Sequence, residues 1–161
     1  MQYFKHTLVL AATLFLGAYA TAQSVTISNS WVRATVPGQK ATGAFMTLTS
    51  KDNAKLVAVS SPAAGVTAIH EMKMDKDVMK MAALANGLDL PAGQAVDLKP
   101  GGYHIMLMDL KSPLSKDASV PLSLTFQDSS GKKSQQMVQV PVGTQPPAGQ
   151  GMGHSHGDHQ H

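Results

Sequence analysis

Residues 70–81 read HEMKMDKDVMKM, and charged side chains alternate with histidine or methionine along both halves of this stretch. A period of two is typical of a β-strand that exposes one face to solvent. The residues between the two halves, Asp75-Lys76-Asp77, tolerate the backbone geometry of a tight turn. The stretch therefore predicts a β-hairpin.

A hairpin loop of two or four residues centred on Lys76 and Asp77 would place the histidine and all four methionines of this stretch on one face. The opposed pairs would then be Met74 and Met79, Met72 and Met81, and His70 and Ala83. His70 and Met81 become diagonal neighbours with Cα atoms about 7 to 8 Å apart, so both side chains can reach one ion. A slip of one residue would send Met81 to the opposite face.

The chain around the hairpin repeats short apolar or alternating runs, which Pro, Gly, Asp and Asn separate. These runs predict strands over residues 25–36, 44–49, 55–60, 66–74, 78–84, 103–110, 120–127 and 133–140, with a further short one over 95–98. No run keeps a helical period, so we expect little helix. Seven to nine short strands indicate an all-β fold, an antiparallel β-sandwich with Greek-key connections. We expect Trp31, the only tryptophan, to pack in its core.

Residues 101–108 read GGYHIMLM and alternate in the same way. One face would carry His104, Met106 and Met108, and the other Tyr103, Ile105 and Leu107. We expect the Ile105 face to join the core and the His104 face to carry ligands. If this strand starts near the outer end of the hairpin, it completes a set of four: His70, Met81, His104 and Met106.

Two imidazoles and two thioethers form a soft, neutral ligand set, which points to copper and in particular to Cu(I). The chain contains no cysteine. Disulfides and thiol redox catalysis are therefore excluded, and so is a blue copper centre, which needs a cysteine thiolate.

Core packing is the alternative explanation for any single methionine in this region, because methionine fills irregular gaps well. The pattern His-x-Met occurs twice, however, at residues 70 and 104, and six methionines fall between residues 72 and 108. This combination favours a soft-metal site. Met72 is either an auxiliary ligand or a packing residue. Met74, Met79 and Met108 either form an apolar rim where an acceptor docks or fill the sandwich.

The N-terminus predicts export. Lys5 and His6 precede an apolar run over residues 8–20, and small residues follow. The run has about 13 residues, fewer than the roughly 20 that span a bilayer, so we interpret residues 1–22 as a cleaved signal peptide rather than an anchor. Cleavage would follow Ala22 or, alternatively, Ala20. Residues 23–142 then form one domain with no membrane span. The formal charge of +3 and the few aromatic residues give no indication of nucleic-acid binding.

Residues 143–161 are rich in Gly, Pro, Gln and His, which predicts a disordered tail. The tail carries four histidines: His154, His156, His159 and His161. We interpret them as an auxiliary site for a metal such as Cu(II), Zn(II) or Ni(II), since their interrupted spacing differs from that of an affinity tag.

The ligand spacing resembles that of the periplasmic copper chaperones called PCuAC. Their signature is a histidine, about ten residues, a methionine, about twenty-one residues, then His-x-Met. Here ten residues separate His70 from Met81, and twenty-two separate Met81 from His104. A loop within residues 82–103 can absorb the one-residue difference. The likeness extends from about residue 31 to 140 and includes GAFM at 43–46, HEM at 70–72 and LKPGGYH at 98–104.

The resemblance implies a cupredoxin-like β-sandwich that binds one Cu(I) through His70, Met81, His104 and Met106. It further implies a periplasmic carrier that is not an enzyme and donates copper to the binuclear centre of cytochrome c oxidase subunit II, often beside a Sco-type protein. We expect a monomer. A copper-sequestering tolerance protein, a copper-dependent enzyme and a metal-free structural module are the alternatives. No three-histidine or carboxylate-rich site favours the enzyme.

Overall fold

The computed structural model describes residues 24–148 and forms ten strands with no helix in that range. The strands are β1 (Val25–Arg33), β2 (Ala41–Ser50), β3 (Ala54–Ser60), β4 (Ala64–Asp75), β5 (Val78–Ala83), β6 (Leu88–Leu90), β7 (Ala95–Leu98), β8 (Tyr103–Leu110), β9 (Ser119–Asp128) and β10 (Lys133–Gly143). The predicted all-β sandwich is confirmed. The predicted signal peptide and the tail histidines lie outside the described residues. Within residues 24–148 the chain has no helix long and apolar enough to cross a membrane.

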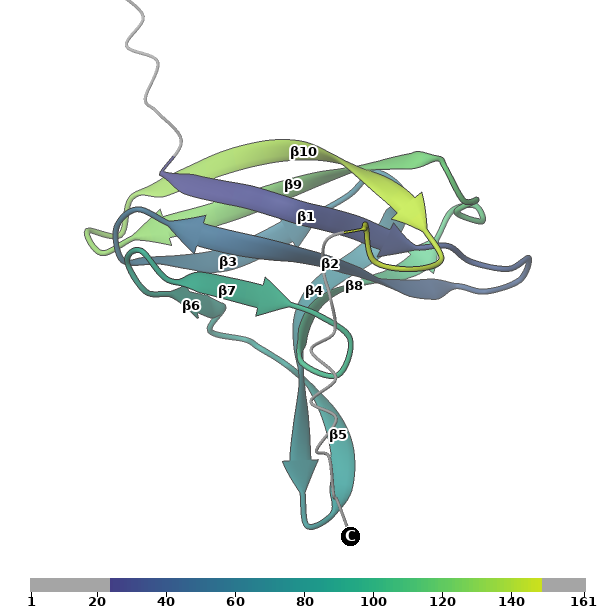
Figure 1. Cartoon of the computed structure of the whole chain (residues 1–161), viewed down its shortest axis with the longest axis horizontal. Helices are drawn as coiled ribbons and strands as arrows, with labels where there is room; N and C mark the ends of the chain where they lie inside the picture. Colours follow the sequence, from purple (N-terminus) through teal and green to yellow (C-terminus); the bar gives the residue numbers. More distant parts are fainter. Residues whose placement is uncertain (1–23, 149–161) are drawn as a thin grey trace, which may run out of the picture.

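The strands hydrogen-bond in the order β5-β4-β8-β7-β2-β1-β10-β9-β3-β6. The strands from β5 to β1 in this order form one layer, and those from β10 to β6 form the layer stacked on it (Figure 1). The layers join where β1 pairs with β10. Alternate residues of the strands other than β5 point between the layers and form the core, among them Met46 and Leu48 of β2 and Leu122 and Leu124 of β9. Ile105 of β8 is fully buried in this core, as its alternation predicts.

Three features of the fold differ from the sequence expectations. Strand β6 was not expected, because three residues are too few to show a period. The pairings β1–β10 and β7–β8 are parallel, whereas the remaining pairings are antiparallel as predicted. Strand β10 extends to Gly143, the first residue of the predicted tail, because Gly143 pairs with Arg33.

The prediction that Trp31 packs in the core is confirmed by its burial. The indole is 3% exposed, yet it packs outside the cluster between the layers, which its neighbour Val32 joins instead. A bulge between Ser28 and Trp31 shifts the register of β1, and Asn29 within it has a φ of 52°. The extra residue reverses the face of every residue that follows.

Strand β5 and the outer half of β4 project from the sandwich as a two-stranded arm, residues 72–81 (Figure 1). The loop at its tip consists of Lys76 and Asp77 alone, with φ values of 48° and 65°. Positive φ at both positions is the turn geometry whose twist suits a two-residue hairpin. The predicted pairs of the hairpin are confirmed, but the arm lies outside the sandwich, so its methionines do not fill the core.

Candidate metal centre

The sheet order places β4 between β5 and β8, so the three strands that carry the predicted ligands are neighbours. His70 lies directly opposite His104, and their rings meet edge to face with centroids 5.6 Å apart. Directly opposed residues on this face form rows across the strands. Met106, opposite Ala68, is one row further from the tip of the arm than the two histidines, and Met81, opposite Met72, is one row closer to the tip. The four predicted ligands therefore occupy three successive rows of one sheet face.

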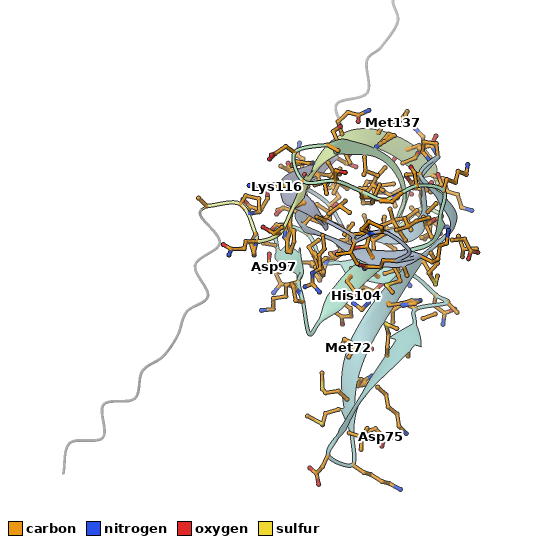
Figure 2. The ribbon with its side chains drawn as sticks, turned by 90° about the vertical axis from the view of Figure 1, so that its right-hand side faces the viewer. Met72, Asp75, Asp97, His104, Lys116 and Met137 are labelled. Atoms are coloured by element: carbon orange, nitrogen blue, oxygen red, sulfur yellow. The ribbon has the colours of Figure 1, made fainter. Side chains whose placement is uncertain are left out.

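An open pocket of about 320 Å³ lies beside these rows. Three of the predicted ligands, Met81, His104 and Met106, line it together with Met72. Figure 2 shows His104 where the sandwich meets the arm, with Met72 below it on the arm. His70 is the one predicted ligand that does not line the pocket. Its Nδ1 is buried without a hydrogen-bond partner, and it is therefore an atom that could hold a metal beside His104.

The backbone fixes the ring of His104, which is 8% exposed. Its Nδ1 lies 3.1 Å from the carbonyl oxygen of Gly102. A carbonyl only accepts, so Nδ1 donates its proton there and the lone pair of Nε2 is left for a metal. The turn before β8 positions this carbonyl, since Gly101 has a φ of 82° and Gly102 donates to the carbonyl of Lys99. Sequence reasoning missed this role of Gly102, although the pair of glycines before Tyr103 marked the turn.

An aromatic wall, Trp31 and Phe45, stands next to His104 on the same outer face. The rings of Phe45 and His104 have centroids 6.5 Å apart, and Trp31 stacks on Phe45 at 4.8 Å. The guanidinium of Arg33 lies 5.5 Å from the centre of the Phe45 ring. Gly43 makes room for this ring, since a Cβ at that position would lie 2.8 Å from its Cζ. The wall limits the access of water to one side of the imidazole.

Burial and, to a smaller extent, the nearby His104 lower the pKa of His70 below its ordinary value of 6.5. His70 is therefore neutral at pH 7, which is the form that binds a metal. In a pH titration of the metal-free protein by NMR, we expect the ring protons of His70 to shift with a midpoint below 6.5. In His104→Gln the midpoint should rise towards 6.5, because that variant removes one of the two causes. A midpoint at or above 6.5 in the unaltered protein would contradict this expectation.

The donor chemistry of the pocket is neutral and soft. Among the described residues, no group of three or more His, Cys, Asp or Glu side chains could hold a metal ion. The thioethers of Met72, Met81 and Met106 line the pocket with His104. Such a donor set suits a soft monovalent ion and offers little to Mg²⁺ or Ca²⁺, which require oxygen ligands.

A family described as putative lipoprotein LpqE-like matches residues 25–142, which is most of the chain. The chain belongs to the LpqE-like family. Among the relatives of this LpqE-like chain, a putative lipoprotein of Leifsonia xyli is 35% identical over 121 residues, 75% of this chain and 70% of the relative. An uncharacterized protein of Rickettsia prowazekii is 32% identical over 122 residues, 73% of this chain and 65% of the relative.

Solved structures with the same fold confirm that the LpqE-like chain is of the PCuAC type. The apo PCuAC domain from PmoF1 superposes with a TM-score of 0.61 at 21% identity, over 78% of this chain and 98% of that domain. Apo-DR1885 from Deinococcus radiodurans gives a TM-score of 0.54 at 27% identity, over 89% of this chain and 95% of that one. The Cu(I) form of DR1885 gives a TM-score of 0.52 at 32% identity, over 78% of this chain and 82% of that one.

Proposed function

We propose that this protein is an exported copper carrier that holds one Cu(I) at the junction of β4, β5 and β8 and passes it to an acceptor protein. The observation that carries the proposal is the row of His70 and His104 between two methionines, beside a pocket whose lining residues include no carboxylate or thiolate. Copper-bound structures among the PCuAC neighbours support the choice of metal. The predicted signal peptide and the relative named as a putative lipoprotein support export to the periplasm.

His104, Met106 and Met81 are the proposed ligands that already line the pocket. His70 is the proposed fourth ligand, since its buried Nδ1 has no other partner. Met72 also lines the pocket and is the alternative fourth ligand or an auxiliary one. All five side chains are neutral when they coordinate, so the site with Cu(I) bound carries a net charge of +1.

The exposure of this site favours delivery over catalysis. Met81 is 51% exposed, so an incoming ligand can reach the metal from solvent. Thioethers bind Cu(I) less tightly than thiolates do, and transfer to an acceptor with cysteine ligands is therefore downhill. The pocket offers no general acid and base pair in contact, and we accordingly propose a carrier and not an enzyme.

The proposed acceptor is the binuclear copper site of cytochrome c oxidase subunit II, and the proposed helper is a Sco-type protein. The test is to load the protein with one equivalent of Cu(I) under anaerobic conditions and to mix it with the soluble domain of each candidate. We expect one tight equivalent that moves to the acceptor thiolates, measured by copper content after separation. Tight binding without transfer would instead indicate sequestration, and turnover of a substrate would indicate an enzyme.

We also propose that His154, His156, His159 and His161 bind a borderline ion such as Cu(II), which enters the same pocket after a one-electron reductant from outside the protein has converted it to Cu(I). Strand β10 ends beside the site, because Gly143 pairs with Arg33 and Arg33 lines the pocket. An extended chain covers up to about 3.3 to 3.6 Å per residue, so the segment after Gly143 is long enough to return to the pocket.

A further inference from the structure

Four methionines form a two-by-two ladder on one face of the arm. Met72 lies opposite Met81 in the inner row, and Met74 lies opposite Met79 in the outer row. Directly opposed side chains in an antiparallel pair have Cβ atoms about 4.5 to 5.5 Å apart. The two thioethers of each row can therefore contact one ion.

The outer row does not serve the packing of the sandwich. Met74 is 62% exposed and Met79 is 45% exposed, and within residues 24–148 β5 pairs with no strand other than β4. Neither side chain lines the pocket described above. Exposed strand positions are better filled by β-branched or polar residues, so packing and strand propensity leave the two thioethers unexplained.

Apart from the turn residues Lys76 and Asp77, the charged side chains of the arm lie on its opposite face by strand alternation. Lys73 pairs with Glu71 at 3.5 Å, and Lys80 pairs with Asp75 at 2.5 Å. The methionine face is consequently free of carboxylates that would attract hard divalent ions. A neutral face of thioethers selects a soft monovalent cation.

The ladder leads directly to the pocket. Successive residues on one strand face are separated by about 6.8 Å, which is twice the rise per residue. The outer row is one such step from Met72 and Met81, and these two residues line the pocket beside His104. An ion can pass from row to row by exchanging one thioether for the next.

We propose that Met74 and Met79, with Met72 from the inner row, form a second and weaker Cu(I) site through which the pocket is loaded and unloaded. The site contains no imidazole and is open to water, so it binds less tightly than the pocket does. Copper remains Cu(I) throughout, and only metal–sulfur bonds form and break. This inference rests on the proposed function, in which the pocket holds Cu(I).

The test uses the double variant Met74→Leu/Met79→Leu, which removes both sulfurs and keeps apolar side chains of similar volume. In the unaltered protein with ¹³C-labelled methionine methyl groups, we expect the first equivalent of Ag(I), a redox-inert substitute for Cu(I), to shift the signals of Met81 and Met106. The second equivalent should shift those of Met74 and Met79. In the double variant, Cu(I) affinity for the first equivalent should be unchanged, and Cu(I) transfer to a chelator should be several-fold slower.

The matched control is Met137→Leu. Met137 is 75% exposed on β10, and Figure 2 shows it at the end of the molecule opposite Met72. This variant should keep the transfer rate of the unaltered protein. Unshifted Met74 and Met79 signals at two equivalents, or an unchanged transfer rate in the double variant, would overturn the second site alone. Failure of the first equivalent to shift Met81 and Met106 would overturn the proposed function and this inference with it.

Discussion

Replacing His104 with alanine should lower the affinity for Cu(I) by roughly 100-fold or more, because groups that merely orient a ligand already contribute about 10- to 100-fold. His104 is the imidazole whose Nδ1 is fixed by the Gly102 carbonyl and whose ring lines the pocket. Its replacement removes a preoriented donor as well as a ligand. The affinity is measured by anaerobic competition with a chromophoric Cu(I) chelator.

The companion variant Met106→Leu should also have a lower affinity for Cu(I), because it removes the sulfur and keeps an apolar side chain of similar volume. Its matched control is Met108→Leu, two residues further along the same face of β8, since Met108 does not line the pocket. Thermal unfolding of each variant separates loss of a ligand from loss of the fold. Normal Cu(I) affinity in both His104→Ala and Met106→Leu would refute the proposed site.

Oxidation of Met81 and Met106 to their sulfoxides should abolish tight Cu(I) binding, because the sulfoxide replaces a soft thioether with a polar group. Met81 is 51% exposed and should react with peroxide well before the half-buried Met106. The loss of affinity should therefore follow the oxidation of Met81, measured by peptide mass spectrometry. Treatment with methionine sulfoxide reductases should restore binding.

Met137 supplies the internal control for this experiment, since its 75% exposure makes it at least as reactive as Met81. Oxidation confined to Met137 should leave the affinity for Cu(I) unchanged. Loading with Ag(I) before peroxide is added should protect Met81 and not Met137. Unaltered affinity after complete oxidation of Met81 and Met106 would refute their assignment as ligands.

The sequence predicted most of the hairpin because its determinants are local. Alternation fixed the shared face of His70, Met72 and Met74, and the Lys76-Asp77 turn fixed their partners on β5. The core side of β8 was predicted in the same way, from the alternation around Ile105. The LpqE-like family and the PCuAC fold agree with the resemblance carried by the His-x-Met spacing.

Other features depend on contacts that no local pattern records. The bulge at Asn29 reverses the face of Trp31, and it arises from how β1 pairs with β2. Residues Leu88–Leu90 form a strand because both leucines are buried against β3, which three residues of sequence cannot indicate. Spacing likewise could not reveal that Met72 lines the pocket and that His70 lies beside it.

The sequence by itself determined nine of the ten described strands, the turn of the hairpin and the soft, cysteine-free set of donor side chains, because a period of two and turn chemistry act between near neighbours. Only the tertiary structure decided that β4 lies between β5 and β8, that His70 faces His104, and that the arm projects with three of its four methionines exposed. Those arrangements join segments far apart in the chain. They are selected by burial of the whole core between the two layers, which no single segment encodes.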